Sequence, residues 1–219
     1  AACIIELARR TKCRFGLLGR SPLPELDPLE AETDDAAIKR ALLARAKAAG
    51  ETITPKDLGW RSARIKAAKE IRTTLAAVKA VGGDARYISV DVRDVNALCD
   101  EFEALRSLWG PIRGLVHGAG VIQDRRIEDK TDEQFDMVFN TKVGGFWALC
   151  AATAQDPLKA LCVFSSVAGR AGNVGQSDYS MANEVLNKSA QIESRRRSDC
   201  IVKSIAWGPW DGGMVGPDL

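Results

Sequence analysis

Short apolar runs of strand type alternate with longer helical patterns along this chain, and this alternation limits the possible folds more than any other feature. Strands are expected at residues 14–18, 86–90, 112–117, 160–164 and 201–206, and helices at 95–108, 132–153 and 179–196. Continuous apolar strands separated by helices indicate a parallel sheet with helices on both faces. The sequence therefore predicts an α/β fold with a doubly wound sheet, in which nucleotides bind at the carboxyl ends of the strands.

The composition is that of a soluble globular domain. Hydrophobic residues make up 46% and charged residues 27% of the 219 residues, and the net charge of +2 is too small to indicate a nucleic acid or a membrane surface as partner. No apolar run approaches the roughly 20 residues of a membrane span. The six cysteines are scattered and the only histidine is His117, so we expect reduced thiols, a cytoplasmic location and no metal site.

About 65 residues separate the first two expected strands, where one crossover helix would be enough. Helical patterns at 36–49 and 62–81 predict a helical insertion at about 30–82 within a single domain of residues 1–219. This insertion is either a surface element packed on one edge of the domain or a docking surface for a partner domain.

The beginning of the chain resembles a helix, although a doubly wound dinucleotide fold starts with a strand and a glycine-rich turn. That first strand and turn are apparently missing from the sequence as given. We expect a T-G-G-x-x-G-I type of sequence directly before Ala1 in the parent protein.

One motif suggests a reaction. Ser166 stands thirteen residues before Tyr179, and Asn183 follows four residues later, so the tyrosine and the asparagine are expected to face one cleft from one side of a helix. Phenols release a proton only near pH 10, and a tyrosine acid therefore needs a hydroxyl neighbour and a cation. Two hydroxyl donors can stabilise an alkoxide, while the hydride must come from a cofactor. The motif predicts a carbonyl reductase.

The end of the second strand of a dinucleotide fold, which corresponds here to the expected strand at residues 14–18, indicates which cofactor is used. An acidic residue there would bind the ribose 2′-hydroxyl of NAD, whereas an arginine accommodates the 2′-phosphate of NADP. This chain has Gly19, Arg20 and Ser21 at that point, and an arginine can pair with phosphate through two hydrogen bonds. NADPH is therefore the expected cofactor.

Seven motifs in order resemble the catalytic half of a ketoreductase domain from type I polyketide synthases and polyunsaturated fatty acid synthases, within the short-chain dehydrogenase/reductase superfamily. The motifs are LLGRS (17–21), DVRD (91–94), HGAGVIQD (117–124), FNTKVGG (139–145), FSSVAG (164–169), YSMAN (179–183) and WGPWDGGM (207–214). The resemblance extends from Leu17 to Met214 and implies a Rossmann-like fold.

The resemblance also implies catalytic roles. Tyr179 corresponds to the general acid, Ser166 to the serine that hydrogen-bonds the same substrate oxygen, and Lys142 to the catalytic lysine of polyketide ketoreductases. A nearby ammonium would stabilise the developing phenolate. Asn183 occupies the position where most superfamily members have lysine, and this exchange is characteristic of the polyketide branch.

Further cofactor contacts are implied at Asp91, Val92, Gly118, Ala119, Gly120 and Pro209. Asp91 and Val92 resemble the pair that lines the adenine, and Pro209 is expected to border the nicotinamide. The residues from Gly118 to Gly120 resemble a turn of small residues that lets the backbone approach the cofactor. His117 belongs to that motif and is not expected to act as a base.

The product configuration is expected to be the D-alcohol. Ketoreductases of that class carry a Leu-Asp-Asp motif, which corresponds here to Ile122, Gln123 and Asp124. Asp124 is thus kept as the stereocontrol residue. The opposite class has a tryptophan eight residues before the tyrosine, where this chain has Ala171.

Three functional hypotheses remain open. The first is reduction of a β-ketoacyl chain on an acyl carrier protein, beside neighbouring domains of a megasynthase. The second is a catalytically silent structural domain, which the missing glycine-rich turn supports and the complete set of Ser166, Tyr179 and Lys142 opposes. The third is a stand-alone dehydrogenase acting on a small free alcohol, which Asn183 opposes.

Overall fold

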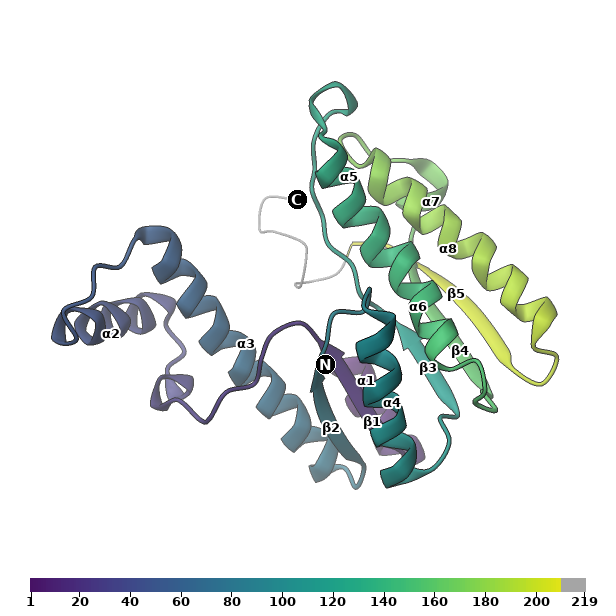
Figure 1. The fold of residues 1–219 in the computed structure, drawn as a ribbon, viewed down its shortest axis with the longest axis horizontal. Helices are drawn as coiled ribbons and strands as arrows, with labels where there is room; N and C mark the ends of the chain where they lie inside the picture. Colours follow the sequence, from purple (N-terminus) through teal and green to yellow (C-terminus); the bar gives the residue numbers. More distant parts are fainter. Residues whose placement is uncertain (210–219) are drawn as a thin grey trace. The chain divides into compact units, whose positions relative to one another are not determined.

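The computed structural model describes residues 1–209, which form two compact units, one of residues 1–90 and one that begins at Asp91 (Figure 1). The elements of the first unit are α1 (Ala2–Thr11), β1 (Arg14–Gly19), the 3-10 helix η1 (Pro28–Ala31), α2 (Asp35–Ala48), α3 (Pro55–Ala80) and β2 (Asp84–Ser89). β1 and β2 are parallel, with Arg14 opposite Asp84 and Gly19 opposite Ser89. The α/β class predicted from the sequence is confirmed in this unit.

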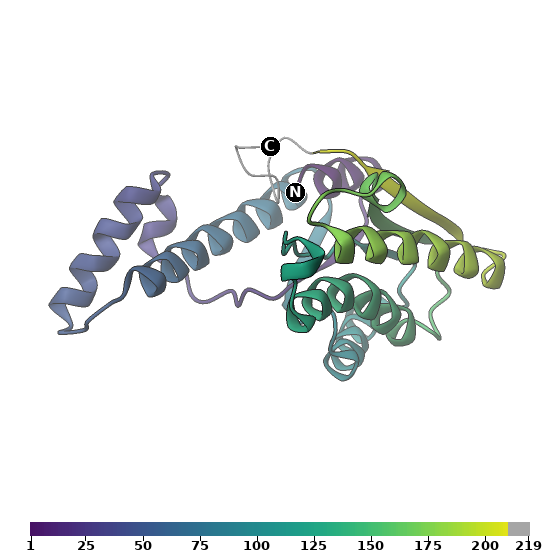
Figure 2. The ribbon, with the colours of Figure 1, turned by 90° about the horizontal axis from the view of Figure 1, so that it is seen from above.

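The helical patterns predicted between these strands form α2 and α3, which pack against each other (Figure 2). Ile38 and Leu42 of α2 are buried, as is Ala68 of α3. α3 begins seven residues earlier than expected because the Thr54 hydroxyl accepts a hydrogen bond from Asp57 N at 3.1 Å, and a proline occupies the first helical position.

The second unit carries most of the remaining predicted elements. They are α4 (Val95–Trp109), β3 (Gly114–His117), the 3-10 helix η2 (Ile127–Asp129), α5 (Asp132–Phe139), the π-helix η3 (Asn140–Gly144), α6 (Gly145–Ala152), β4 (Ala160–Ser166), α7 (Ala168–Ala171), α8 (Ser177–Arg196) and β5 (Ile201–Trp207). The strands form a parallel sheet in the order β3-β4-β5. In residues 1–209, no helix is both long and apolar enough to cross a membrane.

Within the second unit, the helices that belong to residues 91–209 pack against one face of the sheet. Helices α6 and α8 lie on one side of it (Figure 1). Leu115 and Val163 are buried, whereas Val116 on the opposite face of β3 is 54% exposed. Residues 91–209 place their helices on one face, and the strands therefore alternate between buried and exposed positions.

The core of the second unit supplies a test of packing. Phe146 is fully buried on α6, while the adjacent Trp147 is 40% exposed. We expect Phe146→Ala to lower the free energy of unfolding by about 3–5 kcal/mol, because a cavity replaces a large buried ring. Trp147→Ala removes a larger side chain and should cost less than half as much. Denaturant unfolding of both variants measures this, and equal losses would contradict the packing.

Candidate active site

The end of β4 and the start of α8 bring part of the predicted site together. Ser166 is the last residue of β4, and its Oγ accepts a hydrogen bond from Ala168 N at 3.2 Å. Tyr179 lies in the first turn of α8, which packs along β4. Ser165 Oγ donates to Asn183 O at 3.1 Å and ties the strand end to the helix. The serine and the tyrosine thus belong to two directly connected elements.

Lys142 joins them from a break in the helix expected at residues 132–153. That helix forms as α5 and α6 with the π-helix η3 between them, and Lys142 lies within η3. π-Helical turns are frequent at functional sites. The Lys142 ammonium donates to Phe164 O on β4 at 3.1 Å and lies 5.2 Å from the centroid of the Tyr179 ring. The structure therefore places the predicted lysine beside the predicted tyrosine.

Burial sets the protonation of this lysine. Only 3% of Lys142 is exposed, and loss of solvation lowers its pKa from 10.5 to about 8. Since this pKa lies above 7, the side chain remains mostly an ammonium at neutral pH. A cation at the face of the Tyr179 ring is favourable for the ring and for any negative charge that develops on its oxygen.

His117 supports the π-helix. Its Nε2 lies 2.8 Å from Lys142 O, and a carbonyl oxygen can only accept, so the ring proton is on Nε2. Burial lowers the His117 pKa to about 4, and the ring is neutral at physiological pH. His117 therefore acts on the lysine through the backbone that carries it.

Asn183 differs from its expected orientation toward an open cleft. Its side chain is fully buried, and Nδ2 donates to Tyr179 O at 2.7 Å. A short amide one turn along a helix reaches that carbonyl readily. Within the described part of the chain, Asn183 Oδ1 has no hydrogen-bond partner. In this structure Asn183 contacts the backbone of the tyrosine and not its phenol.

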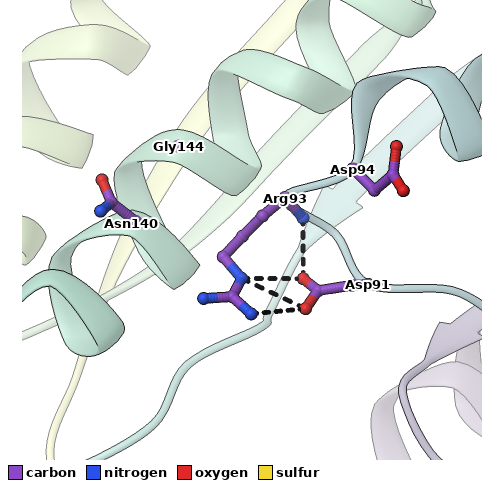
Figure 3. Close-up of a pocket in the computed structure, with 5 residues that line it drawn as sticks. All are labelled: Asp91, Arg93, Asp94, Asn140 and Gly144. Carbon is purple, nitrogen blue, oxygen red and sulfur yellow. Dashed lines mark hydrogen bonds and ion pairs between the residues drawn. The ribbon is translucent and has the colours of Figure 1, made fainter. Parts of the chain in front are cut away.

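Asp91, one of the expected adenine pair, borders a pocket of about 560 Å³ that is also lined by Arg93, Asp94, Asn140 and Gly144 (Figure 3). The Arg93 guanidinium donates to both carboxylate oxygens of Asp91, at 2.7 Å from Nη2 to Oδ2 and 3.0 Å from Nε to Oδ1, and the Arg93 backbone N donates to Oδ1 at 2.9 Å. Val92 packs so closely on Gly145 that a Cβ there would lie 2.7 Å from Val92 Cγ1. The pocket thus adjoins the π-helix that holds Lys142.

The small-residue turn lies against the lysine. Gly118, Ala119 and Gly120 follow β3, and a Cβ on Gly120 would lie 3.1 Å from Lys142 Cε. Only a glycine leaves this space without displacing the lysine. Pro209 follows β5 and is exposed, while the motif residues Trp210 and Met214 lie outside the described residues.

The predicted phosphate-binding turn belongs to the first unit. Gly19 ends β1, and a Cβ there would lie 2.7 Å from the hydroxyl oxygen of Tyr87. That hydroxyl donates to Ser21 O at 2.6 Å and fixes the backbone of the turn. The side chain between them, Arg20, is exposed and available to an anion.

The sequence does not single out Lys130 or Asp178, although they form an ion pair of 2.8 Å with side chains only 4% and 1% exposed. Asp178 directly precedes Tyr179 in the chain. Asp124, by contrast, is exposed and accepts a hydrogen bond from Gln176 at 3.0 Å. In the sequence, Asp178 could have been noticed only because it stands directly before Tyr179. Lys130 lies in a polar segment, where a lysine is expected to be solvated.

Parallel α/β units with a lysine and a tyrosine gathered at the carboxyl end of a strand define a Rossmann-like protein with a candidate reductase site. Residues 6–212 match the family model of the KR domain. Solved ketoreductases from the macrolactin and bacillaene assembly lines each superpose with a TM-score of 0.72, at 24% and 26% identity; they cover 95% and 98% of this chain, and the chain covers 34% and 42% of theirs.

Proteins of similar sequence point to the same family. The chain is 43% identical over 229 residues to a polyunsaturated fatty acid synthase from Thraustochytrium sp., a match that covers 99% of this chain and 8% of that protein. It is 33% identical to a mycocerosic acid synthase-like polyketide synthase of Mycobacterium tuberculosis, over 71% of this chain and 7% of that protein. This chain belongs to the KR domain family, the ketoreductase domains of polyketide and polyunsaturated fatty acid synthases. It spans less than a tenth of the length of these two relatives.

Because the pKa of Lys142 is lowered in the folded state, the free energy of unfolding of the unsubstituted protein should change with pH in a way that a Lys142→Met variant does not share. Between pH 8 and 10.5 the unfolded chain binds more protons at this residue than the folded chain, so stability rises with pH there. Below pH 8 the buried charge costs about 3 kcal/mol. We expect the stability of Lys142→Met relative to the unsubstituted protein to fall by about this amount as pH rises from 8 to 10.5.

Denaturant unfolding of both proteins at a series of pH values measures this difference. Groups that titrate equally in the two proteins do not contribute to it. The matched control is Lys188→Met, since Lys188 lies on α8 with 58% of its side chain exposed. A stability difference for Lys142→Met that is independent of pH would contradict a buried ammonium.

Proposed function

We propose that this chain is an NADPH-dependent reductase that converts a β-ketoacyl group on an acyl carrier protein to the β-hydroxyacyl group, as one domain of a multidomain synthase. The observation that carries the proposal is the buried ammonium of Lys142, 5.2 Å from the Tyr179 ring and bonded to the strand that ends in Ser166. Membership of the KR domain family supports the same reaction class.

The proposed chemistry divides between the cofactor and the chain. NADPH, when bound, supplies the hydride that reduces the substrate carbonyl carbon. The Tyr179 hydroxyl transfers its proton to the oxygen that becomes an alkoxide, and Ser166 donates a hydrogen bond to the same oxygen. Lys142 stabilises the phenolate that remains, and Asn183 holds the first turn of α8 through the Tyr179 carbonyl.

Features of the described chain fit the cofactor. Arg20 follows a strand and is exposed, with a turn backbone fixed by Tyr87, and we assign it to the 2′-phosphate. We assign the pocket beside Asp91 and Val92 to the adenine, and the turn of Gly118, Ala119 and Gly120 to close backbone approach. Pro209 is proposed to border the nicotinamide.

The remaining assignments follow the same resemblance. Asp124 is proposed to guide the substrate so that the D-alcohol forms, and the Gln176 amide holds its carboxylate. The partners are an acyl carrier protein and the neighbouring domains of a synthase. All six cysteines, which lie within the described residues, are free, and this supports a cytoplasmic location.

Replacement of the proposed acid tests the reaction. We expect Tyr179→Phe to lower kcat for reduction of a β-ketoacyl thioester by a factor of about 100 to 10,000, because the variant keeps the ring but has no proton to donate. The assay measures β-hydroxyacyl thioester formed by the complete protein that contains this domain. No reduction by the unsubstituted protein would instead indicate a catalytically silent domain.

Cofactor choice has its own test. We expect Arg20→Ala to weaken NADPH binding by roughly 10- to 100-fold and to leave NADH binding nearly unchanged, because a charge-assisted pair with the 2′-phosphate contributes about 1.5–3 kcal/mol. Titration with each cofactor measures the ratio of the two affinities. Arg14→Ala, which removes an exposed arginine from the opposite end of β1, is the control. An unchanged ratio in Arg20→Ala would exclude this role.

A further inference from the structure

A buried ion pair beside the proposed acid has no part in the chemistry described so far. Lys130 Nζ lies 2.8 Å from Asp178 Oδ2, and both side chains are almost completely buried. Lys130 comes from the loop after β3, at the end of η2, and Asp178 from the first turn of α8. The two charges thus connect two segments that are 48 residues apart in the chain.

Each partner makes a second bond that extends this connection. The Lys130 ammonium also donates to Gln123 O at 2.6 Å, directly before Asp124. The second oxygen of Asp178 accepts from Tyr179 N at 2.8 Å. A continuous chain of hydrogen bonds therefore runs from the backbone beside Asp124 to the backbone of Tyr179.

The same two segments meet at two further points. Arg125 N donates to Gly175 O at 2.9 Å, and Gln176 Nε2 donates to Asp124 Oδ2 at 3.0 Å. Gly175 has φ +78°, which a glycine adopts freely and other residues adopt rarely. The buried pair is thus the innermost of three links between the loop and the helix start.

Stability alone does not explain such a pair. Removing two charges from water costs several kcal/mol for each ion, and apolar residues of similar volume often stabilise a fold as well or better. What the pair provides is a defined geometry, because a charged pair with further hydrogen bonds has few alternative arrangements. The segments that it holds are those that carry Asp124 and Tyr179.

We propose that Lys130 and Asp178 are positioning residues that fix the loop of Gln123 and Asp124 relative to the hydroxyl of Tyr179, and so set both the rate of reduction and the face of the carbonyl that is reduced. The inference rests on the proposed function. Neither side chain needs to touch the substrate, since a displacement of about 1 Å at the acid is enough to cost roughly 100-fold in rate.

The first test is Lys130→Met in the complete protein. We expect kcat for reduction of a β-ketoacyl thioester to fall by roughly 10- to 100-fold. We expect the unsubstituted protein to form a single D-alcohol, and the variant to form a mixture of both enantiomers by chiral chromatography. Lys188→Met is the matched control on α8, and its rate and product should equal those of the unsubstituted protein. Lys130→Arg keeps the charge and should recover part of the selectivity.

A double variant separates positioning from stability. Lys130→Met alone leaves Asp178 buried without its cation and should lower Tm, whereas Lys130→Met with Asp178→Leu replaces the pair by apolar groups and should restore Tm. We expect the double variant to remain slow and unselective, because the bonds to Gln123 O and Tyr179 N are still absent.

Recovery of both kcat and selectivity in the double variant would overturn the inference, since the pair would then act only through stability. So would a Lys130→Met variant with unchanged rate and product. Absence of turnover in the unsubstituted protein is a separate result: it removes the proposed function itself, and with it this role of the pair.

Discussion

The buried ammonium of Lys142 is the interaction on which the rest of the candidate site depends. Burial of this charge lowers the pKa to about 8 and costs about 3 kcal/mol, which the fold must offset elsewhere. Its position between Phe164 O and the ring of Tyr179 brings a cation to the side chain that we propose as the acid. In return, the buried ammonium can stabilise a nearby negative charge more strongly than it would in water, because the protein interior screens the interaction less.

Several features of the second unit serve this placement. The π-helix adds one residue to the helical turn, and the Lys142 ammonium at this point reaches Phe164 O of β4. His117, neutral and buried, bonds the carbonyl of that same residue, and Gly120 leaves room for the lysine chain. The hydrogen bonds of Asn183 and Asp178 to the backbone of Tyr179 fix the position of the tyrosine. The backbones of Lys142 and Tyr179 are thus held on both sides of the candidate site, and the Lys142 ammonium is held in addition by Phe164 O.

The pattern of apolar residues in short windows of the sequence was sufficient to predict most strands and helices of the fold. All five predicted strands form within one or two residues of the expected positions, since apolar β-branched runs are recognisable from short windows. α3 began earlier than expected because its cap, Thr54, lies outside the apolar stripe used to predict the helix. The π-helix within 132–153 was missed because α6, which follows it, is buried at most of its positions and has no polar face that would mark a shift in the helical pattern. The KR family, inferred from seven motifs, is confirmed by the comparisons, while the roles of the individual site residues stay predictions.

The sequence alone determined the α/β class and the family, and it singled out Ser166, Tyr179 and Lys142 as candidates, because these depend on local periodicity and on fixed spacings along the chain. Only the tertiary structure decided which groups meet. It buried Asn183 against a backbone carbonyl and paired Lys130 with Asp178. Burial and partnership arise from residues far apart in sequence, and a lysine in a polar loop carries no local sign that its charge will be enclosed.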